Sequence, residues 1–75
     1  MKIGQVSQVV GRVMKVNDPY PTTVMQVTYL GTDGSGGDSY SVIYVCDKME
    51  YGGKVETKVA TLAFDSFGIM TEDWR

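Results

Sequence analysis

The sequence contains no histidine and only one cysteine, Cys46, among its 75 residues. A serine or cysteine hydrolase needs an imidazole to activate its nucleophile, and one cysteine forms no disulfide within the chain. The common zinc sites need histidines or clustered cysteines and are excluded in the same way. Glu72 and Asp73 are adjacent in the sequence, so they do not resemble an acid and base that flank a substrate. We therefore expect no enzyme activity, no metal and no cofactor, and we expect Cys46 to be a small buried apolar residue.

Long apolar runs are also missing from the sequence. No stretch is long enough for a signal peptide or a membrane-spanning helix, so we expect a cytoplasmic protein with no membrane partner. Residues 1–75 make one domain with a thin core, because a chain near this size buries only about 60% of the surface that its unfolded form exposes. Small domains often need disulfides, a metal or a partner subunit. With the first two excluded, we expect a homo-oligomer.

Two parts of the chain each carry charges of one sign only. Lys2, Arg12 and Lys15 are the only charged residues among the first sixteen, whereas all charged residues between 18 and 47 are acidic. This asymmetry suits an assembly of copies or an ionic partner, and it equally suits the solvated faces of an ordinary small domain.

What the sequence does contain is a strong hairpin signal. Gly52–Gly53 separates two runs rich in β-branched and aromatic residues, which predicts a two-residue type I′ turn. That turn would place Asp47 opposite Lys58 and Ile43 opposite Leu62. Both faces of the open end of this hairpin would then be apolar, as in strands buried on both sides.

Residues 22–30 alternate as a further strand, while residues 3–16 are ambiguous. Valines recur there at helical spacing, but five valines and Gly11 favour β structure. We predict a long strand bent at Gly11, which the prolines of residues 17–21 end. The tail after Asp65 predicts a turn or a short helix that covers an open end of the sheet or a neighbouring subunit. The expected fold is all-β: a small curved antiparallel sheet or partly open barrel, with the outline of an oligonucleotide-binding or SH3 fold, of four to five strands with a short C-terminal turn or helix.

The glycine-rich stretch between the two central strands resembles a ligand loop only superficially. It lacks the lysine of a phosphate-binding loop, it precedes a strand rather than a helix, and it lacks the ligand series of a calcium loop. We predict that Thr32 to Asp38 form a mobile, solvent-exposed loop with no bound phosphate or metal. Ordering of this loop on a partner, and weak calcium binding by its aspartates, are lesser alternatives.

These observations favour a non-catalytic macromolecular interaction protein. Small acidic single-domain chains of this kind are typical of phage or mobile-element accessory proteins that bind or inhibit a host protein, and of small assembly subunits. The candidate contacts with a protein partner or a second copy are Tyr29, Tyr40, Tyr44, Phe67, Met70 and Trp74.

The alternative is a small β-barrel that binds single-stranded nucleic acid. Such proteins stack bases on aromatic side chains along a basic groove. The candidate contacts for this function are Arg12, Lys15, Tyr20, Tyr51 and Lys54.

Overall fold

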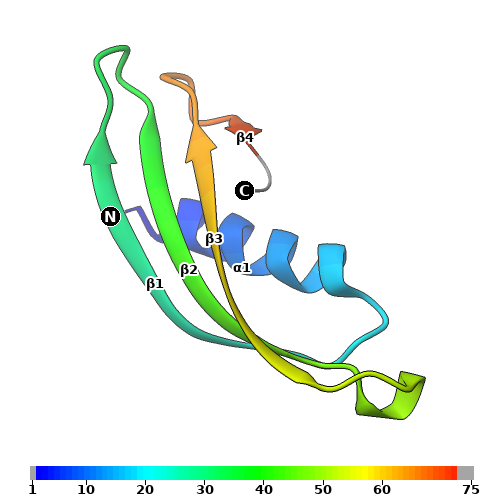
Figure 1. Ribbon diagram of the computed structural model, residues 1–75. Coiled ribbons are helices and arrows are strands. Elements are labelled where there is room, and N and C mark those ends of the chain that lie inside the picture. The colour runs from blue at the N-terminus through cyan, green and yellow to red at the C-terminus, as the bar shows by residue number, and fades with distance from the viewer. Residues whose placement is uncertain (1, 73–75) are drawn as a thin grey trace.

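In the computed structural model, which describes residues 2–72, one helix packs against a four-stranded antiparallel sheet (Figure 1). The elements are α1 (Ile3–Asn17), β1 (Thr22–Thr32), β2 (Asp38–Asp47), a 3₁₀ turn (Met49–Tyr51), β3 (Val55–Phe64) and β4 (Met70–Glu72). The strands lie in the order β1–β2–β3–β4, and the sheet curls around α1 as an open half-barrel. The predicted small curved antiparallel sheet is confirmed. Among the described residues β1 and β4 do not pair, so no closed barrel of the oligonucleotide-binding or SH3 kind is formed.

Helix α1 replaces the predicted strand bent at Gly11, so that prediction is wrong. Val9 and Val13 lie one helical turn apart and are fully buried against the sheet, and Gln5 and Asn17 continue this buried stripe. Fully burying a valine is worth roughly 1.5 to 3 kcal/mol. Helix propensity opposes this by at most about 1 kcal/mol at the glycine and less at each valine. Gly11 faces outward, where an added Cβ would meet nothing within 4 Å. Burial therefore outweighs propensity here.

The helix ends where the proline-containing connection begins, as the sequence indicates. The Asn17 side chain donates a hydrogen bond to the carbonyl of Val13 at 2.8 Å, and the carbonyl of Asn17 accepts one from the amide of Tyr20 at 2.8 Å. Between them the Asp18–Pro19 peptide bond is cis. The chain then enters β1.

Strand β1 pairs with β2 and contains two bulges. The pairing skips Met25, which lies between Val24 and Gln26, and it skips Leu30 in the same way. Each bulge adds one residue, so the side chains that follow it alternate between the two sides of the sheet in the opposite order. Met25 therefore lies on the opposite side of the sheet from Val27, although simple alternation placed the two side chains together.

The β2–β3 hairpin is present, but the predicted register is wrong. Lys58 lies opposite Tyr44 rather than Asp47, a displacement of three residues along β2, and Asp47 pairs with Val55. An odd displacement exchanges the two faces of the strand. The turn is longer than predicted because it contains the 3₁₀ turn, and Gly52 has a positive φ of 84° while its neighbour Gly53 does not.

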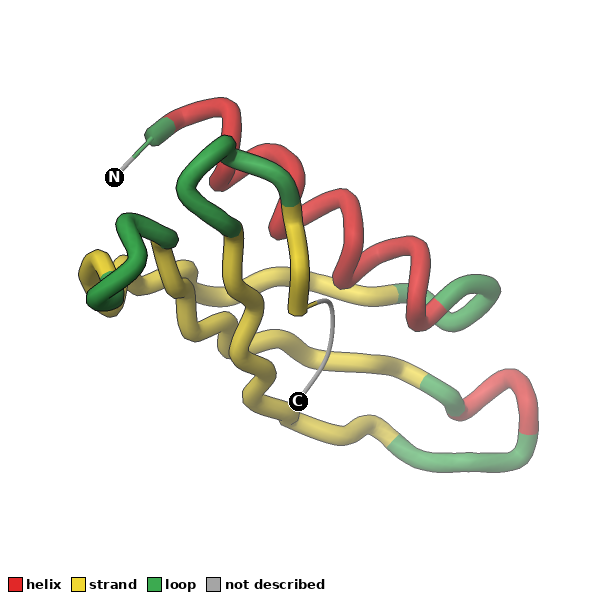
Figure 2. Tube along the Cα trace, turned by 90° about the horizontal axis from the view of Figure 1, so that it is seen from above, coloured by secondary structure: helices red, strands yellow, loops and turns green. Residues whose placement is uncertain are grey.

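The core lies between α1 and one side of the sheet, here called the inner face. Figure 2 shows the helix on this side alone. The buried side chains are Val9 and Val13 of α1, Tyr40, Val42, Tyr44 and Cys46 of β2, and Ala60, Leu62 and Phe64 of β3. The expectation of a buried cysteine is confirmed, whereas the expectation of strands buried on both sides is wrong, because apolar residues on the other side are exposed.

The glycine-rich loop between β1 and β2 is held together by Asp33. One carboxylate oxygen of Asp33 accepts hydrogen bonds from the amides of Gly37 and Ser35, both at 2.9 Å, and from the Ser35 hydroxyl at 2.8 Å. These bonds, that from Gly37 first, lower the pKa of Asp33. Gly37 packs against the end of β3, where an added Cβ would lie 2.3 Å from the carbonyl oxygen of Phe64. The predicted exposure therefore fails at Gly37 and Asp38, which are buried.

The chain after β3 makes a turn and a strand rather than a short helix within the described residues. A carboxylate oxygen of Asp65 accepts hydrogen bonds from the amides of Phe67 and Ile69, both at 2.9 Å. Gly68, with φ at 82°, permits the reversal that leads into β4. The Phe67 side chain is 87% exposed and so does not cover the sheet. Within residues 2–72, no helix has the length and apolar character needed to cross a membrane.

Candidate protein-binding surface

The side of the sheet turned away from α1 is here called the outer face. Opposite residues of an antiparallel pair point to the same side, so the register fixes its members. They are Thr23, Met25, Gln26 and Thr28 of β1, Ser39, Ser41, Ile43, Val45 and Asp47 of β2, and Val55, Thr57, Val59, Thr61 and Ala63 of β3. Asp47 is the single charged residue in this set of described residues.

The outer face has an apolar centre. Ile43 pairs with Val59 on one side and lies beside the Met25 bulge on the other. The side chains of Met25 and Val59 are each 62% exposed. Charged residues are depleted from the cores of protein interfaces, and contiguous exposed apolar residues on a small domain often mark an interaction surface. This composition suits a protein partner better than a charged ligand.

The two margins of the sheet differ in how they are protected. Strand β1 forms one margin over eleven residues, Thr22–Thr32, and its sequence contains no charged residue. The other margin, β3, carries Glu56 and Lys58 and is covered near Phe64 by β4. Natural sheets protect exposed edges with charges, prolines, bulges or covering segments. Apart from its two bulges, the described edge of β1 has none of these.

The residues expected to contact a partner are scattered by the fold. Tyr40 and Tyr44 are a correction, because both are buried in the core and unavailable for contact. Tyr29 is half-buried on the inner face, Phe67 is exposed in the turn before β4, and Met70 packs against the core. The sixth residue, Trp74, lies outside the described part of the chain.

Two of the expected nucleic-acid contacts lie on the helix. Arg12 and Lys15 line a shallow depression of about 220 Å³ together with Gln8, Gly11 and Met70. The depression is open to solvent and contains two cationic side chains but no aromatic ring. It therefore lacks the stacking platform that single-stranded nucleic acid requires.

The remaining expected contacts lie at the turn between β2 and β3. The rings of Tyr20 and Tyr51 meet edge to face with centroids 5.2 Å apart, and the Lys48 ammonium lies 5.2 Å from the centre of the Tyr20 ring. Lys48 also forms an ion pair with Glu56 at 3.2 Å, which raises the pKa of Lys48 and lowers that of Glu56. The backbone carbonyl of Lys54 accepts a hydrogen bond from the Lys48 amide. These contacts stabilise the turn and engage the Tyr20 ring and the Lys48 charge, whereas Tyr51 and Lys54 remain exposed.

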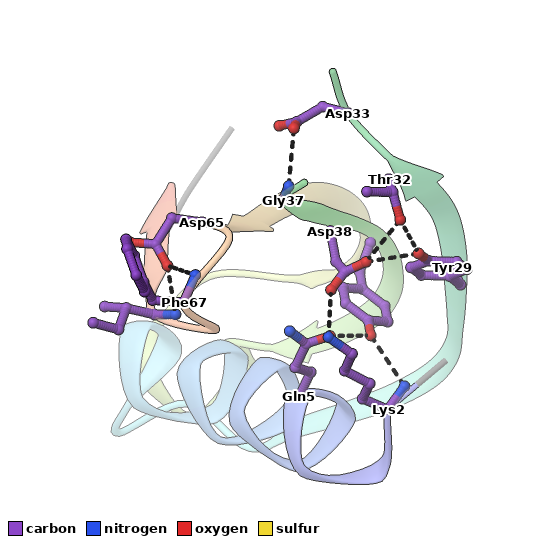
Figure 3. Close-up of polar contacts among 11 residues, drawn as sticks. Lys2, Gln5, Tyr29, Thr32, Asp33, Gly37, Asp38, Asp65 and Phe67 are labelled. Carbon is purple, nitrogen blue, oxygen red and sulfur yellow. Dashed lines mark hydrogen bonds and ion pairs between the residues drawn. The ribbon is translucent and has the colours of Figure 1, made fainter. Parts of the chain in front are cut away.

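A polar cluster that the sequence analysis missed surrounds Asp38 at the start of β2 (Figure 3). One carboxylate oxygen accepts hydrogen bonds from the hydroxyls of Tyr29 at 2.6 Å and Thr32 at 3.1 Å, and the other lies 3.3 Å from the Lys2 ammonium. The Tyr29 hydrogen bond is the largest cause that lowers the pKa of Asp38 to about 2, with further contributions from Gln5, Lys2 and Thr32. The same bond raises the pKa of Tyr29.

This cluster also anchors the start of the helix. The Gln5 side chain accepts a hydrogen bond from the Tyr40 hydroxyl at 2.6 Å, and the Lys2 amide donates one to that hydroxyl at 3.4 Å. Among the described residues, no buried side-chain nitrogen or oxygen lacks a partner. The arrangement has the features of a structural clasp rather than a reactive site, because its buried polar side-chain atoms are already bonded.

The described residues also contain no group of three or more cysteine, aspartate or glutamate side chains placed to hold a metal ion. Comparisons with protein-family models, with curated proteins and with solved structures found no match for this chain.

Proposed function

We propose that this chain is a non-catalytic interaction protein that binds a protein partner through the outer face of its sheet. The observation that carries this proposal is the near absence of charge from a face whose apolar centre is exposed. Removing such a surface from water is favourable at roughly 25 cal/mol per Å² of apolar area. An accessory protein that inhibits a host protein, the role suggested by the size and composition, would use the same face.

Features of the rest of the surface point away from catalysis. The depression beside α1 is shallow and open, and Asp38, whose pKa is the most strongly lowered, is already bonded on both carboxylate oxygens. A general base needs a free position toward its substrate. Binding without chemistry is therefore the function that the described side chains support best.

Nucleic-acid binding has weaker support. Two cations of the chain are already engaged in ion pairs, Lys2 with Asp38 and Lys48 with Glu56. The outer face, which is the broad exposed side of the sheet, contributes an acidic residue, Asp47, and no basic one. An affinity for single strands that falls steeply with added salt would revive this alternative.

The proposal is tested by placing a charge at the centre of the outer face. Tagged wild-type protein, Val59→Lys and Ser7→Lys are used to capture proteins from a lysate of the source cell, and the retained proteins are quantified by mass spectrometry. Ser7 is exposed on α1, so Ser7→Lys adds the same charge away from the sheet. A partner retained by wild type and Ser7→Lys should bind Val59→Lys at least about tenfold more weakly, since losing roughly 1.4 kcal/mol of apolar contact corresponds to tenfold in affinity.

Retained proteins that bind all three forms equally would contradict the proposal. The affinity of the purified partner for each form then gives the dissociation constants directly. Circular dichroism of the variants checks that the fold is unchanged.

A further inference from the structure

We infer that the chain forms a symmetric dimer in which β1 pairs antiparallel with β1 of a second copy. This interface uses the backbone edge of β1 rather than the apolar centre of the outer face, so it goes beyond the proposed function. Its first support is the margin that β1 forms: apart from its two bulges, this edge of eleven residues has no charged side chain or proline to protect it. Edge strands of this kind are templates for pairing with another chain.

The partner strand is β1 itself because the other margin is unsuitable. The free part of β3 carries Glu56 and Lys58, and its end is occupied by β4. Pairing β1 with β3 of the next copy would also leave both margins open again and would build an open filament. Pairing β1 with β1 uses the same edge in both copies and closes after two. An uncharged strand also meets its own copy without placing like charges opposite each other.

The bulges limit the register of this pairing. Between Met25 and Leu30 only the stretch Gln26–Tyr29 is regular, with Val27 on the inner face and Thr28 on the outer face. Residues opposite each other in an antiparallel pair point to the same side of the sheet, so one residue of this stretch lies opposite its own copy at the twofold axis. An axis between two neighbouring residues would instead pair an inner-face residue with an outer-face one. Val27 and Thr28 are the central residues. In either register both helices lie on one side of the combined sheet, and the two outer faces join into one surface.

Curvature argues against the competing face-to-face dimer. The sheet curls around α1, so the outer face is convex (Figure 1). Two convex faces of the same shape touch over a small area. An edge pairing does not meet this difficulty, because it continues the curve from one copy into the next.

The size of the edge sets the expected strength. Two of the eleven residues are bulged, so β1 spans nine paired positions. At about 3.4 Å each these give an edge of about 31 Å, and with a height of about 10 Å the interface covers about 310 Å² per copy, or about 620 Å² in total. Stable interfaces bury about 1,200 to 2,000 Å². We therefore expect a weak dimer with a dissociation constant in the micromolar range or above, which forms at high concentration.

Sedimentation equilibrium of the full chain from low micromolar to near-millimolar concentration tests this inference. The expected mass rises from that of one chain toward that of two and not beyond. Thr28→Lys places like charges at or beside the axis in either register and should weaken dimerisation at least tenfold, whereas Thr57→Lys, the same change at an exposed outer-face position on β3, should leave it unchanged. A mass of one chain throughout, or equal weakening by both variants, would overturn the inference.

Crosslinking identifies the interface directly. Thr28, Ser41 and Thr61 lie in one row across β1, β2 and β3. A short bismaleimide should link two copies of Thr28→Cys but not two copies of Thr61→Cys, because five strand spacings, about 24 Å, would separate the latter. The native Cys46 is buried and does not compete. Linkage of Thr61→Cys would indicate a face-to-face dimer and reject the edge pairing, while the docking role of the outer face is judged separately by Val59→Lys.

Discussion

The glycine-rich loop approaches the end of β3 closely at Gly37, so a substitution of Gly37 tests whether the loop packs against this strand. An alanine Cβ at this position would lie 2.3 Å from the carbonyl oxygen of Phe64 and 3.1 Å from a carboxylate oxygen of Asp33. The first neighbour is backbone and cannot move without displacing the strand. Gly37 has no positive φ, so the expected effect of Gly37→Ala is steric alone.

The matched control is Gly34→Ala in the same loop, where an added Cβ would meet nothing within 4 Å. Forcing extra atoms into a packed site costs roughly 1 to 3 kcal/mol. Replacing an unstrained glycine by alanine instead stabilises by about 0.4 to 1 kcal/mol, because it restricts the unfolded chain. For a domain of this size 1 kcal/mol corresponds to about 6 °C in Tm. Gly37→Ala should therefore lower Tm by about 6 to 18 °C, and Gly34→Ala should raise it by about 2 to 6 °C.

Thermal unfolding followed by circular dichroism measures both values. A mobile loop, as the sequence suggests, would accept alanine at either glycine with little change in Tm. Equal Tm values for the two variants would therefore refute the packing of this loop against β3.

Two further predictions concern the polar cluster and the core. The pKa of Asp38, about 2, lies below its ordinary value of 3.8, so the contribution of the ionised carboxylate to stability is complete above pH about 4 and is lost as the pH falls toward 2. In urea unfolding, the free energy of unfolding of wild type should exceed that of Asp38→Asn by less and less across this interval. A difference that does not change with pH would contradict the clasp. Leu62→Ala should lower the free energy of unfolding by about 2 to 5 kcal/mol, because Leu62 is fully buried. Val59→Ala on the outer face should change it by less than about 1 kcal/mol at concentrations where the chain is monomeric. Similar losses of stability in the two variants would show that the register is wrong.

The strands could be predicted from the sequence because alternation and β-branched residues are local signals. The helix could not, because its decisive signal was the burial of Val9 and Val13 against strands that follow much later in the chain. Five valines and a glycine lower local helix propensity, and only the tertiary contacts reverse that preference.

The hairpin register could not be predicted because two turn signals compete. Gly52–Gly53 indicated a two-residue turn, but a carboxylate oxygen of Asp47 accepts a hydrogen bond from the Met49 amide at 3.0 Å and starts a longer turn. The resulting shift carried Tyr40 and Tyr44 from candidate contacts into the core and hid the outer face. Asp47, two residues before the 3₁₀ turn, was the sequence signal that favours the longer connection.

The dependence of α1 on the sheet has a consequence for the order in which the chain folds. An isolated helix of this length and composition is unstable in water, and its buried valines belong to one core cluster with side chains as distant as Tyr40 and Phe64. The β hairpins join neighbouring segments and form early, whereas contacts between distant residues are delayed by the entropy of closing long loops. Helix α1 is synthesised before the strands but should acquire its structure after them, and a nascent chain that stops before Phe64 should emerge with residues 3–17 unstructured.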